Sequence, residues 1–324
     1  MTHSPGPVSD RPGPAPRLRG DLLSDVVSTA VSAGLLLVLL AVFAATTPAF
    51  RLGSALAFMI SAGWVYALPA VGLTLVMAAG RMDLSGAAVA MLAAALAGRL
   101  DVAGVPLLIG FVAAAVVSAL VGALSGLLAS ISRPASFVVT LATAGLCLAI
   151  AELVLGSQEV VLPVGDGGLT PLLVPGILLA LLGCTLGVIA LVSPAGAWLR
   201  HLGAAREGTV AVRPLVVTLV AAYAVSAVLA AGAGVLELAR TGAAVAPAPT
   251  QLQLGVVLVA LLGGASLRGG RGMGFGAIAA GLAVAALVYG LAALSLNGAG
   301  TLIVLAAALA GAAALDELRS HVLR

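Results

Sequence analysis

The 324-residue sequence contains no lysine, and all fifteen of its basic residues are arginine. A nucleotide-binding P-loop ends in Gly-Lys-Ser/Thr, because its lysine reaches the β- and γ-phosphates of the nucleotide. The sequence therefore excludes a P-loop ATPase in this chain. Any nucleotide hydrolysis must come from another subunit.

Cysteine and histidine are scarce as well. The two cysteines, Cys147 and Cys184, lie alone in separate apolar segments, where we expect them to act as small apolar packing residues. The three histidines are divided between the two chain ends and one predicted loop, so we expect no zinc site. We predict no metal, no cofactor and no catalytic residue, since an intramembrane enzyme usually needs paired carboxylates or histidines.

Charge of either sign is rare. Only 8% of the residues are charged and 62% are hydrophobic, against roughly 25% charged in a soluble domain, and the mean hydropathy is +1.23. Apolar runs of about 20 residues, the length of helix that crosses a hydrocarbon core, recur between Val26 and Leu315. The composition indicates an all-α, multi-pass membrane protein. The arginines in its membrane-flanking loops explain the basic balance, and no nucleic-acid partner is expected.

Ten helical spans fit the hydropathy pattern. The third, eighth and tenth are short, and short or interrupted spans are where transporters often break a helix. The predicted spans are 26–45, 54–79, 84–98, 105–129, 137–155, 173–193, 214–236, 252–267, 275–296 and 299–315.

The arginines orient these spans, because cytoplasmic loops collect positive charge. With the amino terminus inside, twelve arginines face the cytoplasm and three face outward, so both termini are predicted to be cytoplasmic. The inside set is Arg11, Arg17, Arg19, Arg81, Arg133, Arg200, Arg206, Arg213, Arg268, Arg271, Arg319 and Arg324, and the outside set is Arg51, Arg99 and Arg240.

The two chain ends differ from the apolar middle. Residues 1–20 are rich in proline, glycine and charge, which predicts a disordered cytoplasmic tail. A signal peptide is the alternative, but the apolar run after Asp25 is too long for one. We therefore predict one transmembrane domain over 21–318 and a short cytoplasmic tail over 319–324.

Residues 68–86 form the most unusual stretch, with the sequence LPAVGLTLVMAAGRMDLSG. Pro69 and Gly72 interrupt an apolar run, because proline leaves a carbonyl unpaired and glycine permits close helix contact. Thr74 can donate to the carbonyl of Ala70. The charged Gly80–Asp83 segment then breaks the pattern, so we predict a broken span with a hinge.

Asp83 is a carboxylate in a long apolar region, and such groups are costly at the bilayer centre. It can act as a helix N-cap that accepts from the backbone N–H of Ser85 or Gly86, or it can line a pathway. Near the cytoplasmic side its charge costs less, which favours a cap that fixes the hinge. Glu152, near the outer end of the fifth span, either reaches water or lines the pathway.

Three loops complete the pattern. The outside loop 156–172 could meet an external partner, and the inside loop 193–214, with a short helix expected over 203–212, could meet a cytoplasmic one. The glycine-dense segment 263–274 carries two arginines and is predicted to be a tight cytoplasmic turn rather than a phosphate loop, since no strand precedes it. Its Gly263-x-x-x-Leu267 spacing matches Gly80-x-x-x-Leu84 and hints at internal duplication.

Three stretches carry a resemblance to one family. They are GLTLVMAAGRMDLSGAAVAMLAAALAG (72–98), PASFVVTLATAGLCLAIAELVLGSQEV (134–160) and VVLVALLGGASLRGGRGMGFGAIAAGL (256–282). In order and spacing they resemble signature segments of ribose-type sugar permeases, the membrane subunits of ABC importers. Arg81 replaces the second glycine of that family's G-G-I-D segment.

The resemblance implies a permease of the bacterial plasma membrane that works with cytoplasmic ATPase subunits, a second permease subunit, identical or different, and an external solute-binding protein. It implies an ATPase-coupling segment at Ala204, Ala205, Arg206, Glu207 and Gly208, although Glu207-Gly208 departs from the family pattern. The residues expected at the hinge or pathway are Pro69, Gly72, Thr74, Asp83, Ser85, Phe137 and Thr140.

The solute expected from this resemblance is a sugar or a similar small polar molecule. Importers of nucleosides or branched-chain amino acids share the architecture and remain alternatives. An ion-gradient-driven secondary transporter is a further alternative, because it too has many spans and broken helices. That class needs ionisable groups deep in the membrane, for which Asp83 and Glu152 are the candidates.

Overall fold

The structure is a computed structural model that describes residues 18–156, 173–205, 208–243, 249–272, 274–296 and 298–322. In these residues the chain forms eleven α-helices. They are α1 (Leu18–Thr46), α2 (Leu52–Ala78), α3 (Gly86–Val102), α4 (Leu107–Ala129), α5 (Arg133–Leu155), α6 (Leu173–Val192), α7 (Pro194–Ala204), α8 (Val212–Thr241), α9 (Pro249–Leu262), α10 (Phe275–Ala293) and α11 (Ala299–Val322).

Ten of these helices overlap the ten predicted spans, and α7 is additional. Within the described residues, eight helices are long and apolar enough to cross a membrane: α1, α2, α4, α5, α6, α8, α10 and α11. The protein is therefore an all-α, multi-pass membrane protein. Crossing by the shorter α3 and α9 stays a prediction, as does the side on which the termini lie. Of the predicted tail, residues 1–17 are outside the described residues, and α1 begins at Leu18.

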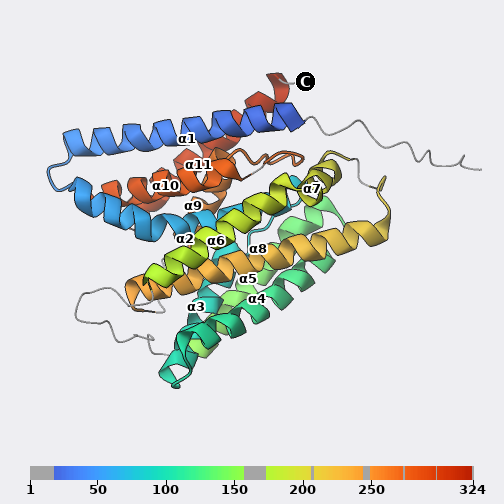
Figure 1. Ribbon diagram of the computed structural model, residues 1–324, viewed down its shortest axis with the longest axis horizontal. Coiled ribbons are helices and arrows are strands. Elements are labelled where there is room, and N and C mark those ends of the chain that lie inside the picture. Colours follow the sequence, from blue (N-terminus) through green and yellow to red (C-terminus); the bar gives the residue numbers. More distant parts are fainter. Residues whose placement is uncertain are drawn as a thin grey trace, which may run out of the picture.

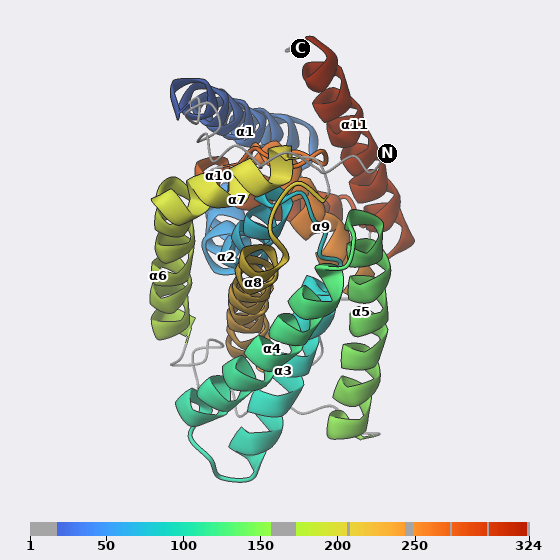
Figure 2. The ribbon, with the colours of Figure 1, turned by 90° about the vertical axis from the view of Figure 1, so that its right-hand side faces the viewer.

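The long helices run side by side, and α7 lies across one end of the bundle (Figures 1 and 2). The central helix is α2, which packs against α6, α8, α9 and α10. It is the most deeply buried of the long helices, as expected of a helix that is apolar all round. In contrast, α1, α4, α5, α6 and α11 expose large apolar side chains, which suits contact with lipid.

Small residues allow the closest helix contacts. Gly122 and Gly126 lie one turn apart on α4 and face the backbone of α8. A Cβ atom added at Gly126 would lie 2.6 Å from the carbonyl oxygen of Leu219. Close backbone approach of this kind is how helices associate where lipid removes the hydrophobic drive for contact.

Two predicted boundaries are wrong because capping residues set the helix starts. The short helix of the inside loop does not lie over 203–212 but forms earlier, as α7, where Ser193 Oγ accepts from Ala195 N at 3.2 Å and Pro194 follows. In the same way α5 begins at Arg133 rather than at 137, because Ser132 Oγ accepts from Ala135 N.

The proposed duplication is one residue out of register. At the end of α2, Gly80 N donates to Met77 O and the next N–H donates to Val76 O. At the end of α9, Gly264 N donates to Leu261 O and the next N–H donates to Ala260 O. Both glycines have positive φ, 70° and 99°, so each helix ends in a Schellman motif. Gly80 thus corresponds to Gly264 and not to Gly263, and the matched leucines of the sequence pattern do not coincide.

Candidate functional site

The α2–α3 connection, residues 79–85, joins the second and third predicted spans at the place where the sequence predicts a hinge. Upstream of it, α2 continues through Pro69 and Gly72, which are both buried, to Ala78. Thr74 Oγ1 donates to the carbonyl oxygen of Ala70 at 2.8 Å, as the sequence predicted. The helix therefore tolerates its proline, and the chain breaks only where Gly80 ends the helix.

Asp83 lies in this connection, 4% exposed, and its carboxylate accepts three hydrogen bonds. Its Oδ1 accepts from Ser85 N at 2.9 Å and from Ser85 Oγ at 2.6 Å, and its Oδ2 accepts from Ser226 Oγ of α8 at 3.1 Å. The predicted donor Ser85 N is thus present. The N-cap position itself is Ser85, because α3 begins at Gly86, so Asp83 fixes the turn before the helix and ties it to α8.

Side chains of α5 and α8 satisfy the backbone of the same connection. Met82 N donates to Ser136 Oγ at 3.2 Å, and Leu84 N donates to Thr140 Oγ1 at 3.1 Å. Tyr223 of α8 donates its hydroxyl to the carbonyl oxygen of Met82 at 2.8 Å. Backbone groups away from water must be paired. The extended connection is therefore held in place by three neighbouring helical side chains.

Three glycine-containing segments meet at the start of this connection. Gly270 N donates to the carbonyl oxygen of Ala78 at 3.1 Å. A Cβ atom on Gly203, in the last turn of α7, would lie 2.5 Å from Gly270 N and 3.0 Å from Gly80 N. We call this contact of Gly80, Gly203 and Gly270 the glycine junction. It places the end of α7 directly against the α2–α3 connection, with no side chain between them.

Arg133, the first residue of α5, forms a second link to the end of α7. Its Nη2 donates to three carbonyl oxygens, those of Leu202 at 3.4 Å, Gly203 at 2.7 Å and Ala205 at 2.8 Å. A cation that binds the last carbonyls of a helix also interacts favourably with the negative end of the helix dipole. Arg133 therefore attaches α5 to the residues directly before and within the predicted coupling segment.

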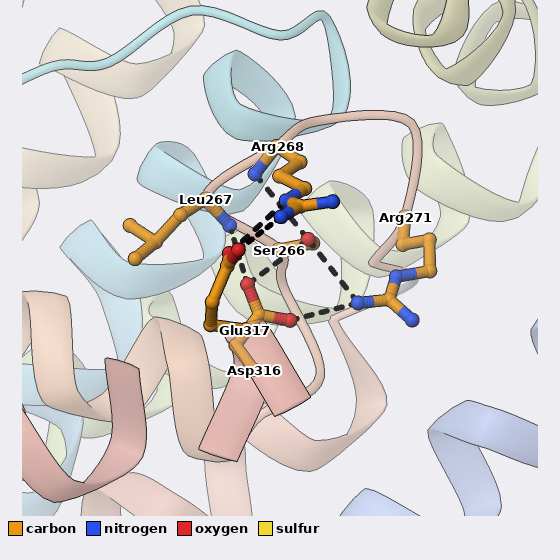
Figure 3. Close-up of polar contacts among 6 residues, drawn as sticks. All are labelled: Ser266, Leu267, Arg268, Arg271, Asp316 and Glu317. Atoms are coloured by element: carbon orange, nitrogen blue, oxygen red, sulfur yellow. Dashed lines mark hydrogen bonds and ion pairs between the residues drawn. The ribbon is translucent and has the colours of Figure 1, made fainter. Parts of the chain in front are cut away.

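The turn after α9 is held by a carboxylate of α11 (Figure 3). Asp316 Oδ1 accepts from Arg271 Nη2 at 2.7 Å, and its Oδ2 accepts from Ser266 Oγ at 3.0 Å and from Leu267 N at 2.9 Å. Both arginines of the predicted turn are paired in this way, since Glu317 forms an ion pair with Arg268. Both arginines stabilise the turn through their carboxylate partners. This agrees with the prediction of a tight turn rather than a phosphate loop.

Helix α1 contributes to the same end of the molecule. Asp25 Oδ2 accepts from Phe275 N at 3.3 Å, at the first residue of α10. Ser32 Oγ donates to the carbonyl oxygen of Leu262, the last residue of α9. The turn between α9 and α10 is thus held from both sides, by α1 and by α11.

Comparison with curated proteins identifies two relatives. A probable ABC transporter permease protein, y4mJ of Sinorhizobium fredii (strain NBRC 101917 / NGR234), is 28% identical over 309 residues, which cover 91% of this chain and 88% of the relative. The galactofuranose transporter permease protein YtfT of Escherichia coli (strain K12) is 32% identical over 216 residues, 63% of this chain and 62% of the relative. The chain is similar to ABC transporter permeases.

These ABC permease relatives confirm the resemblance that the three sequence stretches indicated. No family model matches the chain, and no solved structure matches it either. Both relatives are named as transporter permeases, in agreement with the long apolar helices of this chain.

The structure brings together most of the predicted hinge residues. Asp83 accepts from Ser85, and Thr140 accepts from the N–H of Leu84, which lies between them in the chain. Gly72 of α2 lies close to Ser226, which donates to Asp83, since an added Cβ atom at Gly72 would be 2.8 Å from Ser226 Cα. Phe137, by contrast, is 51% exposed on α5. Of the predicted coupling segment, Ala204, Ala205 and Gly208 are described, whereas Arg206 and Glu207 lie outside the described residues.

Sequence analysis missed five residues of the site, namely Arg133, Ser136, Gly203, Tyr223 and Ser226. A usable signal exists for Tyr223 and Ser226, because each places a polar group inside the predicted span 214–236, where it must find a partner. Ser136 lies just before the predicted span 137–155 and gives no such signal. Glycine and arginine at helix ends are too common to be informative.

Proposed function

We propose that this chain is the membrane-spanning permease subunit of a bacterial ABC importer, and that it carries a sugar or a similar small polar solute across the plasma membrane. The relative named for galactofuranose supports the solute class. Because the chain has no lysine for a P-loop, cytoplasmic ATPase subunits supply the energy. A second permease subunit completes the pathway, and an external binding protein delivers the solute.

The observation that carries the mechanism is the glycine junction. The segment 204–208, where the ATPase subunits dock in this proposal, directly follows Gly203. Gly203 touches the backbone of Gly80 and Gly270. A displacement of the docked segment therefore reaches the α2–α3 hinge by direct backbone contact, which is short and stiff.

Arg133 provides a parallel route. It binds the end of α7 at its guanidinium, and the following turns of α5 hold the hinge backbone through Ser136 and Thr140. ATP-driven movement of the coupling segment would shift α5 and the hinge together. In this mechanism Asp83 and Ser226 keep α3 attached to α8 while the hinge moves, so access alternates between the two membrane faces.

The arrangement of the ends supports the orientation. The contacts of Asp25 and Asp316 link the start of α1, the turn after α9 and the end of α11. Helix α7 lies at the same end of the bundle (Figure 1). This is the arginine-rich end of the predicted topology. We assign it to the cytoplasm, with both chain termini.

The test is ATP-coupled uptake in proteoliposomes that contain the permease, its ATPase subunits and the binding protein. The combined change Arg206→Glu and Glu207→Arg should abolish most ATP-dependent uptake, because it reverses both charges of the docking segment. Arg99→Glu, at the outer end of α3, is the matched control and should leave uptake intact. Unchanged uptake by the double variant would refute the coupling assignment. Uptake by the chain alone, driven by an ion gradient, would establish a secondary transporter instead.

A further inference from the structure

A hollow of about 260 Å³ lies between α4 and α6. Both helices pack against α8. The residues that line the hollow fall within 107–111 of α4, 175–183 of α6 and 228–239 of α8, and Leu68 of the central helix α2 completes them. Because α6 ends directly before α7, its lining residues place the hollow in the half of the bundle away from α7 (Figure 1).

Small residues leave this space open. Gly176, Ala180 and Gly183 recur every three or four residues along α6, so they share one face of that helix. On α8, a Cβ atom added at Gly232 would have only one neighbour within 4 Å, the Cδ2 atom of Leu68 at 4.0 Å. A larger residue at Gly232 would therefore occupy the hollow.

The lining determines what the hollow can hold. Every residue that lines it is apolar, so it offers no side-chain donor or acceptor to a sugar. An apolar cavity of about 150 Å³ stays free of water and binds a small apolar molecule. The hollow between α4 and α6 is larger than that. It therefore suits an apolar occupant and neither water nor a polar solute.

The hollow is continuous with the surface that faces lipid. Leu108 and Leu179, at its rim, are 64% and 46% exposed, whereas Ala180 and Leu236, inside it, are each 2% exposed. Lipid tails are as apolar as leucine, and a void that they left empty would lose its dispersion contacts. A protein subunit fits less well, because protein interfaces carry about one hydrogen bond per 100–200 Å².

We infer that this hollow binds one acyl chain of a membrane phospholipid, from the leaflet away from α7. The chain enters between α4 and α6 and reaches Leu68, the residue directly before Pro69 of α2. It differs from the lipid around the bundle because it fills space between helices and supports the packing of α2. The inference depends on neither the solute nor the ATPase subunits.

Photolabelling of the native chain tests the inference without a substitution. The full chain is reconstituted in bilayers that contain a phosphatidylcholine with a diazirine on its acyl chain, and the labelled residues are identified by mass spectrometry. Leu236 should be labelled. Leu238 lies on the same helix and is equally inaccessible, at 0% exposed, but it does not line the hollow and should remain unlabelled. Labelling of Leu236 no stronger than that of Leu238 would overturn the inference.

Lipid retention tests the same site with a variant that fills it. Gly232→Leu should weaken the retention of phospholipid in detergent by about tenfold or more, since its side chain displaces two or more methylene groups. Gly34→Leu is the matched control and should retain lipid as the native chain does, because a Cβ atom added there, on α1, has no neighbour within 4 Å.

Native mass spectrometry of the three proteins counts bound lipids and subunits together. A loss of lipid in Gly232→Leu alone is the expected result. Equal retention by all three proteins would overturn the inference. A changed number of subunits in Gly232→Leu without a change in bound lipid would also overturn it, and would assign the hollow to a protein partner.

Discussion

The glycine junction predicts a large effect for a single added methyl group, Gly203→Ala. Gly203 lies in the last turn of α7, and an added Cβ atom would come within 2.5 Å of Gly270 N and 3.0 Å of Gly80 N. Cβ atoms do not approach backbone atoms this closely, so one of the three segments must move. None of the contacted atoms belongs to a side chain that could rotate away.

The magnitude follows from two opposing terms. Alanine is favoured over glycine within a helix by roughly 0.5–1 kcal/mol, which would stabilise α7. Overpacking costs about 1–3 kcal/mol, and backbone contacts on two sides place this substitution at the upper end. We expect a net loss of about 2 kcal/mol, and a fall in Tm of about 3 °C for a chain of this size.

The assay is thermal unfolding of the purified permease in detergent, followed by uptake in proteoliposomes. Gly145→Ala is the matched control, since Gly145 lies within α5 and an added Cβ atom there has no neighbour within 4 Å. Its Tm should be unchanged or slightly higher. Gly203→Ala should lower both Tm and the uptake per ATP hydrolysed. An unchanged Tm would refute the direct backbone contact on which the coupling route depends.

Three further substitutions follow from the hydrogen bonds of the hinge and the turn. Asp83→Asn should retain most of the stability, because an amide oxygen can still accept from Ser85. Asp83→Ala should lose about 2–3 kcal/mol, because it leaves a buried N–H unpaired. The Tm values of the two variants test this, and equal losses would show that the charge itself is required. Arg133→Met should lower uptake per ATP hydrolysed several-fold at near-native expression, since methionine removes the donor nitrogen Nη2 that binds three carbonyls; native coupling would remove α5 from the route. Asp316→Ala should destabilise the chain more than Asp316→Asn, because only Asn keeps an acceptor for Leu267 N. The expected difference between the two variants is about 1–2 kcal/mol in denaturant unfolding. Equal effects would assign the stabilisation to the Arg271 ion pair.

The sequence predicts the long helices well, because bilayer thickness imposes a minimum length on every apolar run. It predicts helix starts less well. Both α5 and α7 are preceded by a serine N-cap that is followed within two residues by proline. Hydropathy does not detect this local capping signal. The register of the apparent repeat was misjudged for a similar reason, since Gly264 rather than its neighbour adopts the positive φ that ends α9.

The contacts of the site are also of two kinds, those between residues close in the sequence and those between residues far apart in it. The bond from Ser85 N to Asp83 connects residues two apart, and a single sequence can suggest it. Ser226 lies 143 residues from the carboxylate it binds, and Tyr223 lies 141 residues from its acceptor. Such pairings depend on how α8 packs against α2 and α3. Hydrophobic periodicity contains no information on that packing.

The unequal helix lengths have a consequence for the surrounding lipid. At 1.5 Å per residue, the 17 residues of α3 extend about 25 Å and the 30 residues of α8 about 45 Å, so neighbouring helices differ by about 20 Å. A bilayer adjusts to such mismatch by thinning, or the helices tilt and associate to hide the short one. Activity in this protein should therefore vary with acyl-chain length. The membrane thickness at which transport is fastest would report how far the short helices are shielded by the rest of the assembly.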